Sequence, residues 1–332
     1  MKTFCRLRLS ALGYIYLTAM LAGCGGPQPP IGALHTHGSW ITPQAKTIKK
    51  LLYISNDYPG QVLVYNYKTD ELVGTISGFQ NPSGQCVDAK GDVWIADTDS
   101  GIISEYAHGG TAVLGSVKAI QPIGCAISPS GDLAVSAAST GVSDELEVWK
   151  NASGDPIVYA NHACTFLLTP AYDNRGNLIV EGDNTTTGPW EPCVLLAGSP
   201  SLVAATLNQS LLTGGGAAWD GQHIVLTAVR GRGSTKLLRV AIESPGSINV
   251  VGTTTLTNDP NCKSFRAAVG LPFVVGDKNT PLNRNLGKVL LGGNTCPQSR
   301  FGFWRYPSGG EPFKAFGSQP AEPSGSSVSI AD

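Results

Sequence analysis

The chain has 332 residues, of which 42% are hydrophobic and 14% are charged, and its formal net charge is −1. This composition is too apolar for a disordered chain and too poor in charge for a coiled coil, and the lack of basic excess argues against nucleic-acid binding. The 41 glycines and 22 prolines suit a fold of many short strands and tight turns.

The N-terminus has the pattern of an export signal. Positive residues precede the apolar run ALGYIYLTAMLA, whose 12 residues are too few for a membrane-spanning helix. The run ends in Leu-Ala-Gly-Cys at 21–24, which resembles the lipobox of bacterial lipoproteins, where the cysteine is acylated and becomes the first mature residue. The resemblance implies a signal peptide over 1–23 and a lipid anchor on Cys24. The protein is then exported and membrane-anchored, on the periplasmic or outer-membrane side or at the cell surface.

The segment after the lipobox predicts a flexible connection to the folded part. Residues 25–47 are rich in proline and glycine and show no apolar period. We therefore expect a lipidated cysteine and tether over 24–47 and a single folded domain over 48–332.

Six cysteines remain after the signal peptide and the lipid site are set aside. An even number in an exported domain predicts disulfides, with 15 full pairings open, and none of them forms a Cys-x-x-Cys zinc or redox motif. Three of them follow one another at intervals of 39 residues, which places them on neighbouring inner strands and favours a bridge between Cys86 and Cys125. The candidates are Cys86, Cys125, Cys164, Cys193, Cys262 and Cys296.

An internal repeat organises the folded part. A Gly-Asp or Gly-Asn turn followed by an apolar strand recurs, and related strands begin at intervals of 42, 40, 45, 46 and 48 residues. These anchors are Leu51, Val93, Leu133, Leu178, Ile224 and Pro272. A second unit, a strand ending in an aromatic residue before a polar turn, supplies an outer hairpin. Four short strands per repeat predict an all-β fold, a six-bladed β-propeller.

The two ends of the repeat region predict how the ring closes. The opening strand PSGQCVD of the second repeat is echoed by PSGSSVS at 323–329, whereas the first repeat lacks such a strand. We expect the C-terminal strand to complete the first blade, which removes an exposed sheet edge.

The segment NPSGQCVDAKGDVWIADTDSGIISEY resembles one blade of the NHL-repeat family, with ADTDSGIISEY matching its signature. The position of the family's characteristic arginine holds Ile102, so the signature is degenerate. Propellers of the gluconolactonase family share this architecture. The resemblance implies a six-bladed propeller and no particular activity.

Polar residues near the ends of the second strands form a candidate ligand or metal face around the axis. Oxygen ligands of this kind suit Ca²⁺ or another divalent cation, and gluconolactonases bind such a metal with Glu, Asn and Asp. Turn capping by Asp and Asn is the alternative, and repetition once per blade favours it. The residues are Asn56, Asp57, Asp97, Asp99, Glu181, Asp183, Asn184, Asp277 and Asn279.

Two functions fit these observations. The first is a non-catalytic binding or scaffolding lipoprotein of the cell envelope, without a cofactor, that takes a protein or glycan ligand. The second is a metal-dependent lactonase-like hydrolase that uses acidic ligands near the axis. No nucleophile motif is present in the sequence, which favours the first. Metal content and turnover of lactones discriminate between them.

Overall fold

A computed structural model describes residues 38–137, 145–183, 190–209, 214–229, 234–257, 274–275, 288–293, 300–316 and 323–331. Residues 37–332 form one compact unit. Nearly all of its regular structure is β-strand, and the described helices are two short 3-10 turns, Pro43–Thr47 and Lys150–Ala152. Within the described ranges, no helix is long and apolar enough to cross a membrane.

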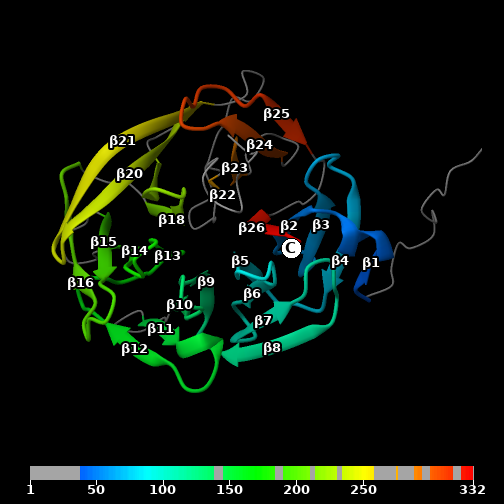
Figure 1. Ribbon diagram of the computed structural model, residues 1–332, viewed down its shortest axis with the longest axis horizontal. Helices are drawn as coiled ribbons and strands as arrows, with labels where there is room; N and C mark the ends of the chain where they lie inside the picture. The colour runs from blue at the N-terminus through cyan, green and yellow to red at the C-terminus, as the bar shows by residue number, and fades with distance from the viewer. Residues whose placement is uncertain are drawn as a thin grey trace, which may run out of the picture. The chain divides into compact units, whose positions relative to one another are not determined.

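Six sheets follow one another along the chain and make a β-propeller (Figure 1). All of their strand pairs are antiparallel except β17 with β21. From the innermost strand outward, the first blade comprises β26 (Pro323–Ile330), β2 (Lys50–Asn56), β3 (Gln61–Asn66), β4 (Leu72–Ser77) and β1 (Trp40–Ile41). The second comprises β5 (Pro82–Val87), β6 (Val93–Asp97), β7 (Ile102–Tyr106) and β8 (Val113–Lys118). The third comprises β9 (Pro122–Ile127), β10 (Leu133–Ala137), β11 (Glu145–Trp149) and β12 (Ile157–Ala160).

The remaining three blades have the same order of strands. The fourth comprises β13 (Ala171–Tyr172), β14 (Leu178–Asp183), β15 (Trp190–Leu195) and β16 (Val203–Ala204). The fifth comprises β18 (Gly214–Trp219), β19 (Ile224–Val229), β20 (Ser234–Ser244), β21 (Ser247–Thr257) and β17 (Thr206–Leu207). The sixth comprises β22 (Val274–Val275), β23 (Lys288–Gly293), β24 (Arg300–Arg305) and β25 (Lys314–Phe316).

Local turn chemistry explains why the Gly-Asp and Gly-Asn pairs recur. In the β5–β6 turn, Asp88 Oδ1 accepts hydrogen bonds from the backbone N–H groups of Lys90 and Asp92, both at 2.9 Å. Gly91 in the same turn has φ +86°, a left-handed conformation that glycine adopts without strain. The β13–β14 turn repeats this arrangement around Asp173, so each such motif encodes the innermost hairpin of a blade.

Alternate residues of one strand pack into two different cores. In β6, Val93 and Ile95 join the cluster shared with the first blade, whereas Trp94 and Ala96 join the cluster shared with the third. Successive side chains on a strand point to opposite faces, so a blade between two neighbours is apolar on both. This double burial explains the near-continuous apolar runs in the inner strands.

The C-terminal strand closes the ring as predicted. β26 pairs antiparallel with β2, with Leu51 opposite Ser329, and it also contacts β5 of the second blade and β22 and β23 of the sixth. The seam to the second blade is polar and tightly packed: Gln85 accepts a hydrogen bond from Ser327 and donates one to Ser55, both at 2.7 Å. The innermost strands thus follow one another in an unbroken circle, β26, β5, β9, β13, β18 and β22.

One side chain contacts both ends of the propeller segment. His108, in the loop after β7, lies with Nδ1 2.6 Å from Ser329 Oγ and Nε2 2.8 Å from the Ile48 carbonyl oxygen. The Ser329 hydroxyl also donates to the Gly91 carbonyl. The chain segments that enter and leave the ring therefore meet at one imidazole.

Two disulfides cross-link the propeller. The expected bridge Cys86–Cys125 joins β5 to β9, with Cα atoms 5.5 Å apart. Cys164 pairs with Cys193 of β15 and lies in the loop before β13, so its predicted place on an inner strand is wrong. Cys262 and Cys296 lie outside the described residues, as does Cys24.

The structure corrects two further boundaries. The Leu-Pro-Phe-Val-Val segment was expected to be the second strand of its blade, but its described part, Val274–Val275, is the innermost strand, and Lys288–Gly293 is the second. The expected tether ends before residue 47, because Trp40 pairs with Thr75 on the edge of the first blade and Ala45 is fully buried. The fifth blade has two 11-residue strands, which lengthen this repeat. The second strand of the sixth blade therefore begins later in the chain than the predicted anchor Pro272.

Gly325→Ala should lower the free energy of unfolding by about 1–3 kcal/mol, because a Cβ at this position would lie 2.1 Å from the Ser83 carbonyl oxygen across the seam. Thermal unfolding would measure it, with Gly38→Ala as the control, since a Cβ there meets nothing within 4 Å. Equal melting temperatures for both variants would contradict a tightly packed seam.

Candidate functional site

The predicted axial residues occupy varied environments. Asn56 ends β2 and is fully buried, and Asp57 follows it. Asp97 ends β6, and its carboxylate accepts backbone N–H groups from Gln80 at 3.1 Å and from Asn81 at 2.7 Å, so it caps the loop that precedes β5. Asp99 is exposed in the next turn. Asp97 therefore acts as a loop cap. Capping is the alternative to a metal face that repetition once per blade favoured in the sequence.

Glu181 of β14 has the most unusual environment of the set. It is fully buried, and its Oε2 accepts the backbone N–H groups of Gly215 at 2.8 Å and Gly216 at 3.4 Å in the neighbouring blade. Burial raises the pKa of Glu181 from 4.5 to about 8, against the opposing effect of these hydrogen bonds. A carboxyl group in this environment binds a proton near neutral pH.

The remaining candidates of the axial set cannot be placed around Glu181. Asn184, Asp277 and Asn279 lie outside the described residues, and of Asp183 only the backbone at the end of β14 is described. The axial metal face therefore stays a prediction. Among the described residues, the one group with the spacing of metal ligands contains none of these positions.

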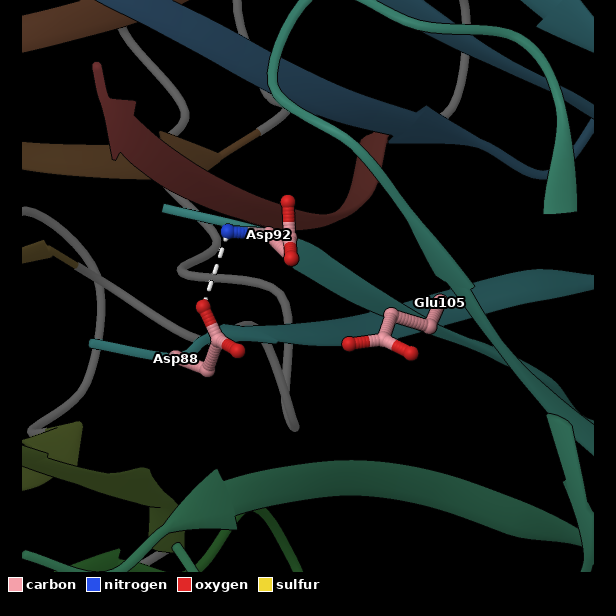
Figure 2. Close-up of side chains that lie close together, drawn as sticks. All are labelled: Asp88, Asp92 and Glu105. Carbon is pink, nitrogen blue, oxygen red and sulfur yellow. Dashed lines mark hydrogen bonds between the residues drawn. The ribbon is translucent and has the colours of Figure 1, made fainter. Parts of the chain in front are cut away.

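That group consists of Asp88, Asp92 and Glu105 in the second blade (Figure 2). Their nearest carboxylate oxygens lie within 4.8 Å of one another. Burial raises the pKa of Glu105, and the charges of Asp92 and Asp88 raise it further. Burial and the charge of Asp88 likewise raise the pKa of Asp92. Asp88 Oδ1 accepts two backbone N–H groups of its own turn. Glu105, in contrast, makes no hydrogen bond or ion pair to any described residue.

Two of these carboxylates, Asp88 and Glu105, border a groove of about 790 Å³ between the second and third blades. Its lining combines carboxylate, ammonium and indole groups from both blades. The lining residues include Asp88, Glu105, Gly115 and Lys118 of the second blade and Trp149 and Asp155 of the third. This mixture suits binding of a ligand that has both polar and apolar parts.

The sequence creates the groove by placing a glycine at the end of a row of side chains. Cross-strand pairing aligns Cys86, Trp94, Glu105 and Gly115 from the inner to the outer strand of the second blade. The inner members pack against the third blade, and the disulfide fixes the spacing there. Gly115 leaves the outer part of the gap open, and a Cβ there would lie 3.1 Å from Glu105 Oε2.

Sequence reasoning missed this site for an identifiable reason. Asp92 was assigned to the Gly-Asp turn motif, Asp88 to the opening strand PSGQCVD, and Glu105 to a strand that ends in an aromatic residue. The register between β6, β7 and β8 brings them together, and that register cannot be derived from the sequence alone. An acidic residue at an inward position opposite a glycine is the signal that was available.

No protein-family model matches the sequence, and no curated protein matches it. Solved structures resemble the fold. A protein of unknown function from Bacteroides caccae superposes with a TM-score of 0.58 at 11% identity, over 85% of this chain and 99% of that one. A functionally unknown protein from Desulfotomaculum acetoxidans gives 0.54 at 11% identity over the same shares. The WD40 repeats of RRP9 give 0.51 at 13% identity, over 82% and 78%. At these identities the likeness shows a β-propeller fold, and the finer resemblance to NHL repeats stays a prediction.

Glu181→Gln should flatten the dependence of stability on pH. Folded Glu181 keeps its proton up to about pH 8, whereas the unfolded group releases it near 4.5, so the wild-type free energy of unfolding falls as pH rises through this window. Glutamine cannot release a proton, so the free energy of unfolding of the variant increases relative to that of the wild type as pH rises. Urea unfolding at pH 5 and pH 8 would measure this, with Glu71→Gln on the exposed surface as the control. Parallel pH profiles for variant and wild type would contradict it.

Proposed function

We propose that this protein is an exported, lipid-anchored and non-catalytic binding module of the cell envelope, whose ligand occupies the groove between the second and third blades. The groove itself is the observation that carries the proposal. It offers about 790 Å³ of space and a half-buried Glu105 carboxylate that makes no hydrogen bond to any described residue. A partly desolvated carboxylate gains more from an incoming polar group than one fully in water.

Export has support from the chemistry of the fold. Two disulfides in one domain fit an oxidising compartment, and the apolar run before Cys24 fits a signal peptide. Lipid attachment at Cys24 remains part of the proposal, because it depends on the resemblance to the lipobox. A ring closed by its own last strand suits a protein that presents a fixed surface outside the cell.

A lactonase-like hydrolase has less support. Such an enzyme needs several ligands that converge on an accessible ion. Glu181 is fully buried, with one oxygen already bonded to the neighbouring blade, and Asp97 caps a loop. The groove lies away from the axial set, and its carboxylates, Asp88 and Glu105 of the second blade and Asp155 of the third, include none of these candidates.

A photoreactive phenylalanine analogue in place of Lys118, which lines the groove, should give covalent adducts with an envelope component in living cells. The same analogue in place of Lys68, an exposed lysine on the first blade, should give none. Electrophoresis and mass spectrometry of the adducts would measure the difference. Absence of adducts from the groove position, or equal adducts from both, would overturn the groove as the binding site.

Cys24→Ser should abolish incorporation of labelled palmitate and move the protein from the membrane to the soluble fraction, because acyl chains supply the membrane affinity. Cys5→Ser, which changes a cysteine inside the signal peptide, is the matched control and should keep both properties. Membrane retention of the Cys24→Ser protein would contradict anchoring at this residue.

A further inference from the structure

The second blade exposes its outer edge, unlike two other blades. The outermost paired strand of the first blade is covered by β1, and that of the fifth is covered by β17. In the described sheet of the second blade, β8 pairs with β7 alone. Val113 and Leu114 of β8 are 54% and 55% exposed. The fold thus accepts a fifth strand on a blade, and β8 presents a free backbone edge of the kind that binds extended peptides.

The groove lies beside this edge, and its charge favours one kind of occupant. Asp88, Glu105 and Asp155 line it, and Asp92 lies beside the first two. Lys90 and Lys118 also line it and offset part of this charge, which leaves more carboxylates than ammonium groups. The excess of negative charge in a partly desolvated position disfavours acidic ligands and favours a basic group.

The strand register connects the edge to the carboxylate. Glu105 is opposite Gly115, and a residue added outside Gly115 on the same face would be the next member of the row. Its backbone would lie two strand spacings from that of Glu105, roughly 10 Å. Because Gly115 has no side chain between them, a long basic side chain can pass over it and meet the carboxylate.

We propose that the groove binds an extended peptide segment that pairs with β8 as a fifth strand and places a lysine or arginine over Gly115, against Glu105. This inference rests on the proposed binding function and names its ligand class. Apolar residues of the segment would cover Val113 and Leu114, and the basic group would form a charge-assisted hydrogen bond with Glu105.

The test is binding of short capped peptides to the mature chain, followed by fluorescence anisotropy. A heptapeptide of alternating threonine and valine with a central lysine should bind at least tenfold more tightly than the same peptide with norleucine, which has the same length without the charge. A central glutamate should abolish binding. Glu105→Gln should weaken the lysine peptide at least tenfold and leave the norleucine peptide unchanged, and Glu71→Gln should change neither.

A second variant guards against loss of folding in Glu105→Gln. Gly115→Val keeps a strand-compatible residue but fills the path over the glycine, so it should remove the preference for lysine while circular dichroism stays unchanged. Equal binding of lysine and norleucine peptides, or no binding of either, would overturn the inference, as would concentration-dependent dimerisation through β8, which would make a second copy the occupant. If the groove photoadduct forms but the lysine peptide does not bind, the proposed binding function is retained and the basic peptide is rejected as its ligand.

Discussion

Hydrogen bonds between β26 and β2 join residues from nearly opposite ends of the chain, with Leu51 opposite Ser329. Without them the inner edge of β2 would be unpaired, and β5 and β22 would lose the neighbour that lies between them. Each blade contacts only the blades beside it, so the first blade alone joins the second to the sixth. The pairing of β26 with β2 inside the first blade, together with the seam between β26 and β5, therefore keeps the circle closed.

The polar character of that seam has a physical reason. The innermost strands crowd toward the axis, where large side chains do not fit. Serine and glycine dominate β26, and β5 begins with Pro-Ser-Gly. The hydroxyl groups of Ser83 and Ser327 donate to the Pro122 carbonyl and to Gln85, so these strands approach closely with both hydroxyl groups hydrogen-bonded. Farther from the axis the blades diverge, and the gap fills with larger residues such as Trp94 and Trp149. The groove arises where that filling stops, at Gly115.

The fold could be predicted from local signals that the structure repeats in each blade. The Gly-Asp turn before Val93 and its counterparts predict the inner hairpins, because the side-chain carboxylates of Asp88 and Asp173 accept backbone N–H groups of those turns. The echo of the PSGQ segment near residue 323 predicts the closing strand. The prediction failed where spacing alone carried it: the long β20–β21 hairpin displaced the sixth anchor, and Cys164 turned to Cys193 in its own blade.

The candidate site was less predictable than the fold, because it depends on relations between strands. Glu105 becomes significant only when β8 places Gly115 opposite it and the third blade stands across the gap. Glu181 was one of nine axial candidates that the sequence did not distinguish, and its burial and its bond to Gly215 follow from the packing of two blades. Residue type can thus identify a carboxylate as a candidate site residue. How far it is exposed to solvent depends on the strand register and on the neighbouring blade.

His108 gives the closure a property that neither terminal strand has alone. Its two ring nitrogens contact the Ile48 carbonyl of the entering segment and the Ser329 hydroxyl of the leaving one. Removal of either segment leaves one nitrogen of the half-buried imidazole without its hydrogen-bond partner. The imidazole is then less firmly placed against the remaining segment. Fraying at the start of the ring and fraying at its finish are consequently coupled, and a protease that trims one end makes the other easier to reach.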